Sequence, residues 1–242
     1  MNQRIVIIPT YNEKENIELM IRKVFSMPVL FDVLIVDDNS PDGTGNIVKG
    51  LMNDYKALHL LERKEKNGLG TAYIAGFRWC LDKGYEYIFE MDADFSHNPD
   101  DLARLYEACV DGADMSVGSR YITGVNVVNW PMSRVMLSYF ASMYVRLITG
   151  MNIQDTTAGF VCYTRKVLQT IDLDKIKFRG YAFQIEMKFT AWRHGFKLTE
   201  VPIIFTDRTR GESKISGGII KEAVWGVLSM KIKSWFRIYS KA

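Results

Sequence analysis

Residues 90–101 read EMDADFSHNPDD, an acidic loop that follows an apolar segment at 85–89. The apolar segment predicts a buried strand, and Pro99 predicts the first residue of the next helix. Asp92 and Asp94 are therefore expected where a strand ends and a loop begins. Open α/β sheets bind ligands at the carboxyl ends of their strands. Two carboxylates at this spacing suit Mg²⁺ or Mn²⁺ held against phosphate groups, although the pair alone also fits a solvated turn.

Apolar and helical segments alternate with short turns through the first half of the chain. Strands are expected at 4–9, 33–37, 58–61, 85–91 and 114–118. Helices are expected at 13–27, with Asn12 as N-cap, and at 43–55, 70–83 and 99 to about 110. The strands at 4–9 and 33–37 are continuous apolar runs, which are typical of strands covered on both faces. This alternation predicts an α/β fold with a mostly parallel sheet flanked by helices.

The second half is richer in aromatic residues and methionine, above all at 120–151. Strands are expected at 157–163 and 198–205, with a helix around 183–194 between them. We find no internal repeat and no linker rich in Pro, Gly or Ser. Residues 1–242 are therefore expected to form one domain, in which 1–118 is a nucleotide-binding half and 119–206 an acceptor half. Residues 207–242 add a basic phosphate-binding loop and an amphipathic helix.

The composition is that of a globular protein with a sizeable core, at 48% apolar and 24% charged residues. A net charge of +3 is too small to argue for a nucleic-acid partner. Cys80, Cys109 and Cys162 form no C-x-x-C pair and are expected as small buried hydrophobes in a reducing compartment. We recognise no signal peptide and no apolar run of the ~20 residues that a spanning helix needs, so a cytoplasmic location is expected. The apolar run at 135–145 could lie on a bilayer or in the core.

The last segment, residues 207–241, carries eight Lys and Arg against three acidic residues. Apolar residues recur there at helical spacing: Ile219, Ile220, Ala223, Val224, Val227 and Leu228. A basic amphipathic helix of this kind can lie in the headgroup layer of an anionic membrane. The same pattern also fits a terminal helix that packs on the body with a solvated basic face.

Other polar residues flank the predicted strands. Asp37 and Asp38 end the strand at 33–37, where a carboxylate can accept hydrogen bonds from a ribose or a base. A P-loop and the G-x-G-x-x-G pattern are both missing from the sequence, so a nucleotide would be held by carboxylates and a metal. The basic loop 208–214 suits a diphosphate. Arg120 and Arg134 suit a second anion, carried by the acceptor.

Six segments, in order along the chain, resemble one known family. They are IPTYNEKENI at 8–17, VDDNSPDGT at 36–44, MDADFSH at 91–97, GSRY at 118–121, AGF at 158–160 and GESK at 211–214. The combination is similar to inverting family-two glycosyltransferases with the Rossmann-like GT-A fold, of the dolichol-phosphate mannosyltransferase type. The resemblance spans nearly the whole chain. It implies transfer of a hexose, mannose from GDP-mannose, onto a polyprenyl (dolichyl or undecaprenyl) phosphate.

The resemblance also implies roles for individual residues. Contacts to the base and ribose would come from Pro9, Tyr11, Glu13, Val36 and Asp38. The diphosphate and its Mg²⁺ or Mn²⁺ would meet Asp92, Ala93 and Asp94, with Arg208 and Lys214 clamping the diphosphate. Ser96 stands where some relatives carry a metal-binding Gln, and as a weaker ligand it could act through water. Arg120 and Arg134 would hold the acceptor phosphate, which makes Asp92, Asp94 and Arg120 the expected catalytic residues.

An acceptor phosphate is already ionised at neutral pH, so its attack on the sugar needs no strong general base. Other interpretations remain open: UDP-glucose as the donor, a glycan as the acceptor, or a nucleotide-sugar-binding protein without turnover. The expected location is the cytoplasmic face of a membrane, held peripherally by its surface, with a membrane protein as a possible partner. Nucleic acid is not an expected partner.

Overall fold

A computed structural model describes residues 3–180, 182–207, 217–235 and 239. Its centre is a seven-stranded sheet with the order β3-β2-β1-β4-β7-β5-β8. The strands are β1 (Arg4–Thr10), β2 (Asp32–Asp37), β3 (Leu58–Glu62), β4 (Tyr87–Glu90), β5 (Met115–Ser119), β7 (Val161–Thr164) and β8 (Leu198–Pro202). In this sheet β7 runs antiparallel to both neighbours, β4 and β5, and the other pairs are parallel. The predicted mostly parallel sheet is confirmed.

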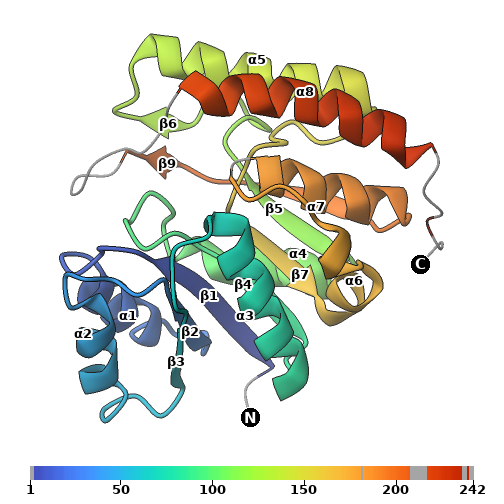
Figure 1. Ribbon diagram of the computed structural model, residues 1–242. Helices are drawn as coiled ribbons and strands as arrows, with labels where there is room; N and C mark the ends of the chain where they lie inside the picture. Colours follow the sequence, from blue (N-terminus) through green and yellow to red (C-terminus); the bar gives the residue numbers. More distant parts are fainter. Residues whose placement is uncertain (1–2, 181, 208–216, 236–238, 240–242) are drawn as a thin grey trace.

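Helices cover both faces of the sheet (Figure 1). One apolar cluster joins the sheet to α1 (Ile17–Phe25), α2 (Thr44–Leu51) and α4 (Asp101–Val110). A second cluster joins the other face to α3 (Leu69–Lys83), α6 (Arg165–Thr170) and α7 (Ala182–Arg193), with the short helix η1 (Leu173–Lys175) between the last two. The strand cores are buried because both faces are covered, as their continuous apolar runs predict. The three cysteines are buried and unbridged, as expected.

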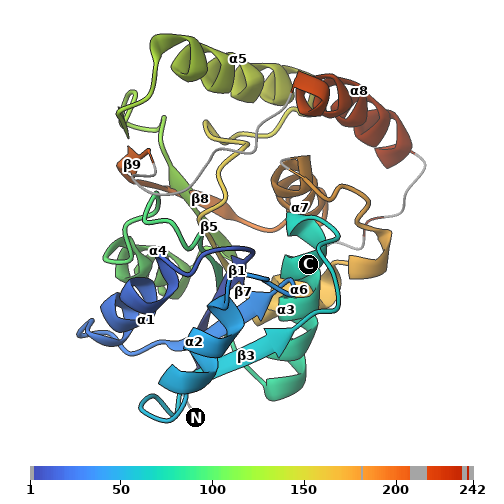
Figure 2. The same cartoon turned by 60° about the vertical axis from the view of Figure 1, so that its left-hand side comes forward.

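A further layer is formed by α5 (Met132–Thr149) and α8 (Gly217–Ser234). The two helices lie side by side beyond α7 in both views (Figure 1 and Figure 2). The Tyr144 hydroxyl donates to the Val224 carbonyl at 3.0 Å, and the Lys231 ammonium donates to the Thr149 carbonyl at 3.0 Å. A small cluster that includes Val145, Phe189 and Val227 packs this layer on α7. Of the helices that the structure describes, none is long and apolar enough to cross a membrane.

Several predicted boundaries are wrong, among them the start of the strand expected at 157–163, which begins at Val161, and the end of the helix expected at 43–55, which ends at Leu51. Asn12 is not an N-cap: it has a left-handed backbone (φ 59°), and α1 begins only at Ile17. The backbone N–H groups of residues 12–14 instead donate to the side chains of Ser40, Thr44 and Asp42, which holds this segment as a loop. Pro99 lies in a turn before α4 rather than in the helix.

The predicted strand at 198–205 is two elements, β8 and β9 (Phe205–Thr206). β9 leaves the main sheet and pairs in parallel with β6 (Val127–Val128). α8 is present where the C-terminal helix was expected. Its amphipathic basic face stays a prediction, because side chains 217–223 and residues 236–238 lie outside the described part.

Candidate active site

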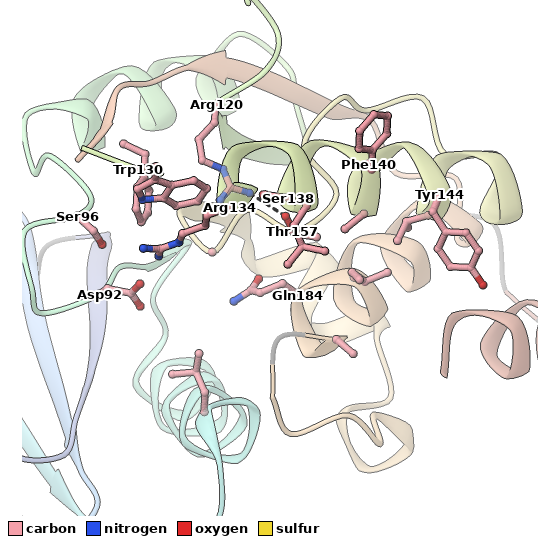
Figure 3. A pocket seen from close by; sticks show the side chains of 18 of the residues that line it. Asp92, Ser96, Arg120, Trp130, Arg134, Ser138, Phe140, Tyr144, Thr157 and Gln184 are labelled. Carbon is pink, nitrogen blue, oxygen red and sulfur yellow. Dashed lines mark hydrogen bonds between the residues drawn. The ribbon is translucent and has the colours of Figure 1, made fainter. Parts of the chain in front are cut away.

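A cavity of about 360 Å³ lies between the carboxyl edge of the sheet and the layer of α5 and α8 (Figure 3). Its polar wall comes from the loop after β4, from the segment after β5 and from α7. Apolar side chains of α5 and α8 form much of the opposite wall, among them Leu137, Phe140 and Val224. The cavity thus places charged groups at one end and a hydrocarbon-like surface at the other.

The loop after β4 brings together three oxygen-bearing side chains of the predicted metal motif, Asp92, Asp94 and Ser96. The side chain of Asp92 is 40% exposed, whereas Asp94 is buried and accepts a hydrogen bond from the Ser96 N–H at 3.0 Å. Phe95 between them has a left-handed backbone (φ 61°), which turns the loop sharply. Ser96 Oγ is buried and has no hydrogen-bond partner among the described residues.

These residues fit a divalent cation. No group of three or more His, Cys, Asp and Glu side chains in the described residues forms a complete protein cage. Mg²⁺ and Mn²⁺ do not need one, because they are commonly held by one or two carboxylates together with substrate phosphates and water. The unpartnered Ser96 hydroxyl could accept a hydrogen bond from such a water or bind the ion directly. The predicted ligand set stays a prediction.

His97 supports this loop from behind. Its Nδ1 accepts the Asp92 backbone N–H at 3.2 Å, and its ring stacks on Phe160 with the centroids 4.9 Å apart. Burial lowers the pKa of His97 to about 4, so the ring is neutral and Nδ1 can serve as an acceptor. His97 therefore supports the acidic motif through a local hydrogen bond to its backbone.

The predicted base and ribose contacts come together at the ends of β1 and β2. Pro9 pairs in register with Val36, and Asp38 follows β2 beside the loop that carries Tyr11 and Glu13. Asp38 forms a buried ion pair with Arg63 at 2.9 Å. Burial raises the pKa of the Asp38 carboxyl more than Arg63 lowers it. β4 is the other neighbour of β1, so this edge leads directly to Asp92.

Arg120 follows β5 and lines the cavity, but much of its charge is already matched. Its Nε and Nη2 donate to the two carboxylate oxygens of Asp155, each at 2.6 Å, and Nη2 also donates to Thr157 at 2.7 Å. Burial alone would raise the pKa of Asp155, yet the adjacent guanidinium holds it below its ordinary value. Nη1 remains the group of Arg120 that could meet an acceptor phosphate.

Arg134, on α5, is the more accessible cation. Its guanidinium lies 4.1 Å from the centre of the Trp130 ring and is 2.9 Å from Asp207. Figure 3 shows Arg134 pointing into the cavity on the side of Asp92. Arg208 and Lys214, the predicted diphosphate clamp, lie outside the described residues.

Two parts of the site were missed from the sequence. Asp155 lies three residues before the AGF segment. The signal that could have found it is a carboxylate directly before the apolar segment at 157–163. Gln184 and Lys188, four residues apart on α7, are polar positions in an almost fully buried helix. Burial raises the pKa of the neighbouring Glu90 carboxyl and lowers that of the Lys188 amine.

Comparison with known proteins identifies the family. The family model of glycosyl transferase family 2 matches residues 5–172. The chain belongs to this family. It is therefore a glycosyltransferase, as the motifs indicate, and the GT-A-like fold expected for the family is confirmed.

Three curated relatives in this family match most of the chain. It is 48% identical to an undecaprenyl-phosphate mannosyltransferase of Micrococcus luteus over 92% of this chain and 93% of the relative. It is 46% identical to a polyprenol monophosphomannose synthase of Mycolicibacterium smegmatis, over 95% and 87%. The third, a dolichol-phosphate mannosyltransferase of Pyrococcus furiosus, is 35% identical over 90% of this chain and 60% of its own length.

Solved structures of the same fold are more distant in sequence. Glucosyl-3-phosphoglycerate synthase from Mycobacterium tuberculosis, in complex with Mn²⁺ and UDP, superposes with a TM-score of 0.67 at 14% identity, covering 95% of this chain and 78% of that one. The mannosyltransferase PcManGT from Pyrobaculum calidifontis, in complex with GDP-Man and Mn²⁺, gives 0.61 at 17% identity, covering 99% and 66%. At these identities the likeness concerns the fold alone.

Proposed function

We propose that this glycosyltransferase moves mannose from GDP-mannose onto the phosphate of a polyprenyl phosphate. One observation carries the proposal: a single cavity holds Asp92 and Asp94 at the donor edge of the sheet, Arg120 and Arg134 opposite them, and an apolar wall beyond. A donor diphosphate, an acceptor phosphate and a prenyl chain need those three surfaces. The names of the curated relatives support the same reaction.

The chemistry follows from the two anions. An acceptor phosphate oxygen attacks the anomeric carbon, a carbon–oxygen bond forms there, and the bond to the donor diphosphate breaks, which releases GDP. Attack from the side opposite the leaving group inverts the anomeric configuration. Arg134 and the Nη1 of Arg120 would orient the attacking phosphate, and its ionised state makes a general base unnecessary.

A divalent cation is part of the proposal, with Asp92, Asp94 and Ser96 as the residues that would hold it. When bound, the cation would neutralise the charge that develops on the leaving diphosphate. Arg208 and Lys214 would add positive charge to the same group.

A direct assay tests this function. The protein is incubated with Mn²⁺, a short polyprenyl phosphate and either GDP-mannose or UDP-glucose, and lipid-linked sugar is detected by mass. We expect product with GDP-mannose, and a loss of at least about 100-fold in Asp94→Ala because the leaving group loses its support. Asp54→Ala, on an exposed turn, is the matched control and should keep full activity.

Each other outcome has a definite meaning. Product with UDP-glucose alone would show that the protein transfers glucose rather than mannose, by the same mechanism. No lipid product with either donor would contradict polyprenyl phosphate as acceptor. Full metal-dependent transfer by Asp94→Ala would show that the Asp94 carboxylate does not hold the metal during transfer.

A membrane surface is the proposed setting of this reaction. The outer face of α5 and α8 exposes large apolar side chains: Met132, Met136, Tyr139, Met143, Leu147, Trp225 and Ile232. Leu147 is 82% exposed and Trp225 66%. The inner sides of the same two helices line the cavity. A bilayer in contact with this face would deliver a prenyl chain beside the arginines, and such apolar exposure is typical of interaction sites.

Vesicle flotation tests the membrane proposal. Met143→Ser combined with Leu147→Ser should weaken binding to vesicles with anionic lipids at least about tenfold, because two exposed apolar side chains are lost. Leu30→Ser, at a 68% exposed leucine in the loop before β2, is the matched control and should bind normally. Equal losses in both variants, or a wild-type protein that stays unbound, would contradict the proposal. The cytoplasmic side of the membrane and a membrane-protein partner remain predictions from the sequence.

A further inference from the structure

Gln184 lies on α7 at the floor of the cavity. Its side chain reaches toward Asp92, in the space below Arg134 (Figure 3). The residue is 3% exposed and still lines the cavity. Neither the metal motif nor the arginines account for a neutral amide at this point.

The orientation of the amide is set from below by buried groups. Gln184 Nε2 donates to Glu90 Oε2 at 2.6 Å, while Gln184 Oε1 faces the Lys188 ammonium, so buried groups orient both ends of the amide. Glu90 also accepts from the Tyr163 hydroxyl at 3.3 Å. Lys188 Nζ lies 3.5 Å from Gln184 Oε1 and donates to the Gln184 and Ala158 backbone carbonyls.

These contacts leave half of the amide's capacity for a ligand. A primary amide has two N–H donors and two carbonyl lone pairs, and among the residues that the structure describes the buried partners use one of each. Gly159 keeps the space beside it open: a Cβ there would lie 3.7 Å from Gln184 Nε2 and 3.8 Å from His97 Cε1. One donor and one acceptor on the same amide match two neighbouring hydroxyl groups.

The position of the amide agrees with the path of the transferred sugar. During transfer the anomeric carbon is bonded first to the donor phosphate and then to the acceptor phosphate. The hexose must therefore lie between Asp92 and the two arginines, and Gln184 is beneath that point. The carboxylates and cations around it match the metal and the anions, whereas a neutral amide matches neutral hydroxyls.

We propose that Gln184 binds the transferred hexose, its second N–H donating to one hydroxyl while Oε1 accepts from the next. The proposal rests on the sugar-transfer function proposed above and deepens it. A site built to hydrogen-bond a hydroxyl discriminates strongly against a ligand that lacks it, since its buried polar atoms are then left unpaired. Gln184 thus becomes a determinant of which sugar is transferred.

A substrate–residue cycle tests this role. Wild-type and Gln184→Leu proteins are assayed with the complete donor and with a set of donors that each lack one hydroxyl of the hexose. We expect the wild type to lose about 10- to 100-fold in kcat/KM with at least one of these donors. With the complete donor, Gln184→Leu should show the same loss in kcat/KM as the wild type shows with the affected deoxy donor. With that deoxy donor, Gln184→Leu should show no further loss. A purely structural effect would instead multiply the two losses.

Three further measurements separate binding from folding. GDP affinity with Mn²⁺ should stay within about twofold of wild type in Gln184→Leu, because the proposal places the hexose, which GDP lacks, against this residue. Gly159→Ala, whose added methyl makes only ordinary contacts, should also lower kcat/KM by filling the sugar's space. Gln169→Leu, at an exposed position of α6, is the matched control and should have no effect.

The outcomes distinguish this inference from the function beneath it. A wild-type protein that transfers no sugar from any donor overturns both. If the wild type transfers sugar but the losses from the substitution and from the missing hydroxyl multiply, the role of Gln184 alone is overturned. The same holds if the wild type transfers sugar equally well from every donor.

Discussion

The ion pair between Arg120 and Asp155 joins two residues that lie 35 positions apart and are both buried. We expect Asp155→Asn to lower the free energy of unfolding by about 3 kcal/mol at pH 7, because the guanidinium loses its counter-charge. The pKa of Asp155 is held below its ordinary value, so this stabilisation is present above that value and is lost as the pH falls below it. Chemical unfolding from pH 7 to about pH 2.5 measures it.

The difference between wild type and Asp155→Asn should therefore narrow below about pH 4. Glu18→Gln, which removes an exposed ion pair with Arg22, is the control and should cost less than about 0.5 kcal/mol. A difference that does not change with pH would mean that the Asp155 charge is not what stabilises the pair.

Arg134 is expected to carry more of the acceptor's charge than Arg120, whose Nε and Nη2 are taken by Asp155 and Thr157. Arg134→Gln should raise the KM for polyprenyl phosphate about 10- to 100-fold while the KM for GDP-mannose stays close to wild type. Arg134→Lys should recover part of the loss, and Arg104→Gln on α4 should change neither constant. Steady-state kinetics with each substrate varied decide this, and a rise in the donor KM alone would contradict it.

At the scale of elements, one glycine determines how closely α8 can approach the body. A Cβ on Gly226 would lie 2.5 Å from Cε1 of the Phe178 ring, which packs against the core cluster beneath. Gly226→Ala should therefore destabilise the protein by about 1–3 kcal/mol through overpacking, although alanine is the better helix former. Thermal unfolding should show a melting temperature lower by several degrees.

Gly50 on α2 provides the matched helix position, because a Cβ added there would meet no other atom within 4 Å. Gly50→Ala should be neutral or stabilising by up to about 1 kcal/mol. Phe178→Leu combined with Gly226→Ala should recover part of the loss. A melting temperature for Gly226→Ala equal to that of Gly50→Ala would show that α8 does not pack this closely.

At the scale of the whole molecule, the proposed donor site draws on the ends of β1, β2 and β4. A ligand bound only by the folded sheet stabilises it by about 2.7 kcal/mol at 100 times its Kd. GDP with Mn²⁺ should then raise the melting temperature by about 5–10 °C. EDTA should remove most of that shift, and so should Asp94→Ala. An undiminished shift with EDTA would indicate nucleotide binding without the metal.

Local patterns along the chain determined much of the architecture. Local sequence patterns located every strand of the main sheet within a few residues. The signal is plainest in β1 and β2, whose apolar runs are typical of strands covered on both faces. The order of the motifs indicated the family and singled out Asp92, Asp94, Arg120 and Arg134, which the structure brings to one cavity. These features are local because each depends on a few consecutive residues.

Tertiary structure alone decided the partners of those residues. The antiparallel insertion of β7 between β4 and β5, the capture of Arg120 by Asp155 and the contact of Gln184 with Glu90 all join distant segments. Gln184 and Glu90 are 94 residues apart, and no periodicity links them. Such pairs depend on strand order and helix packing, which are set by burial of the whole core. The sequence therefore specified which charges the site contains, and the fold determined which of them are matched internally and which face a ligand.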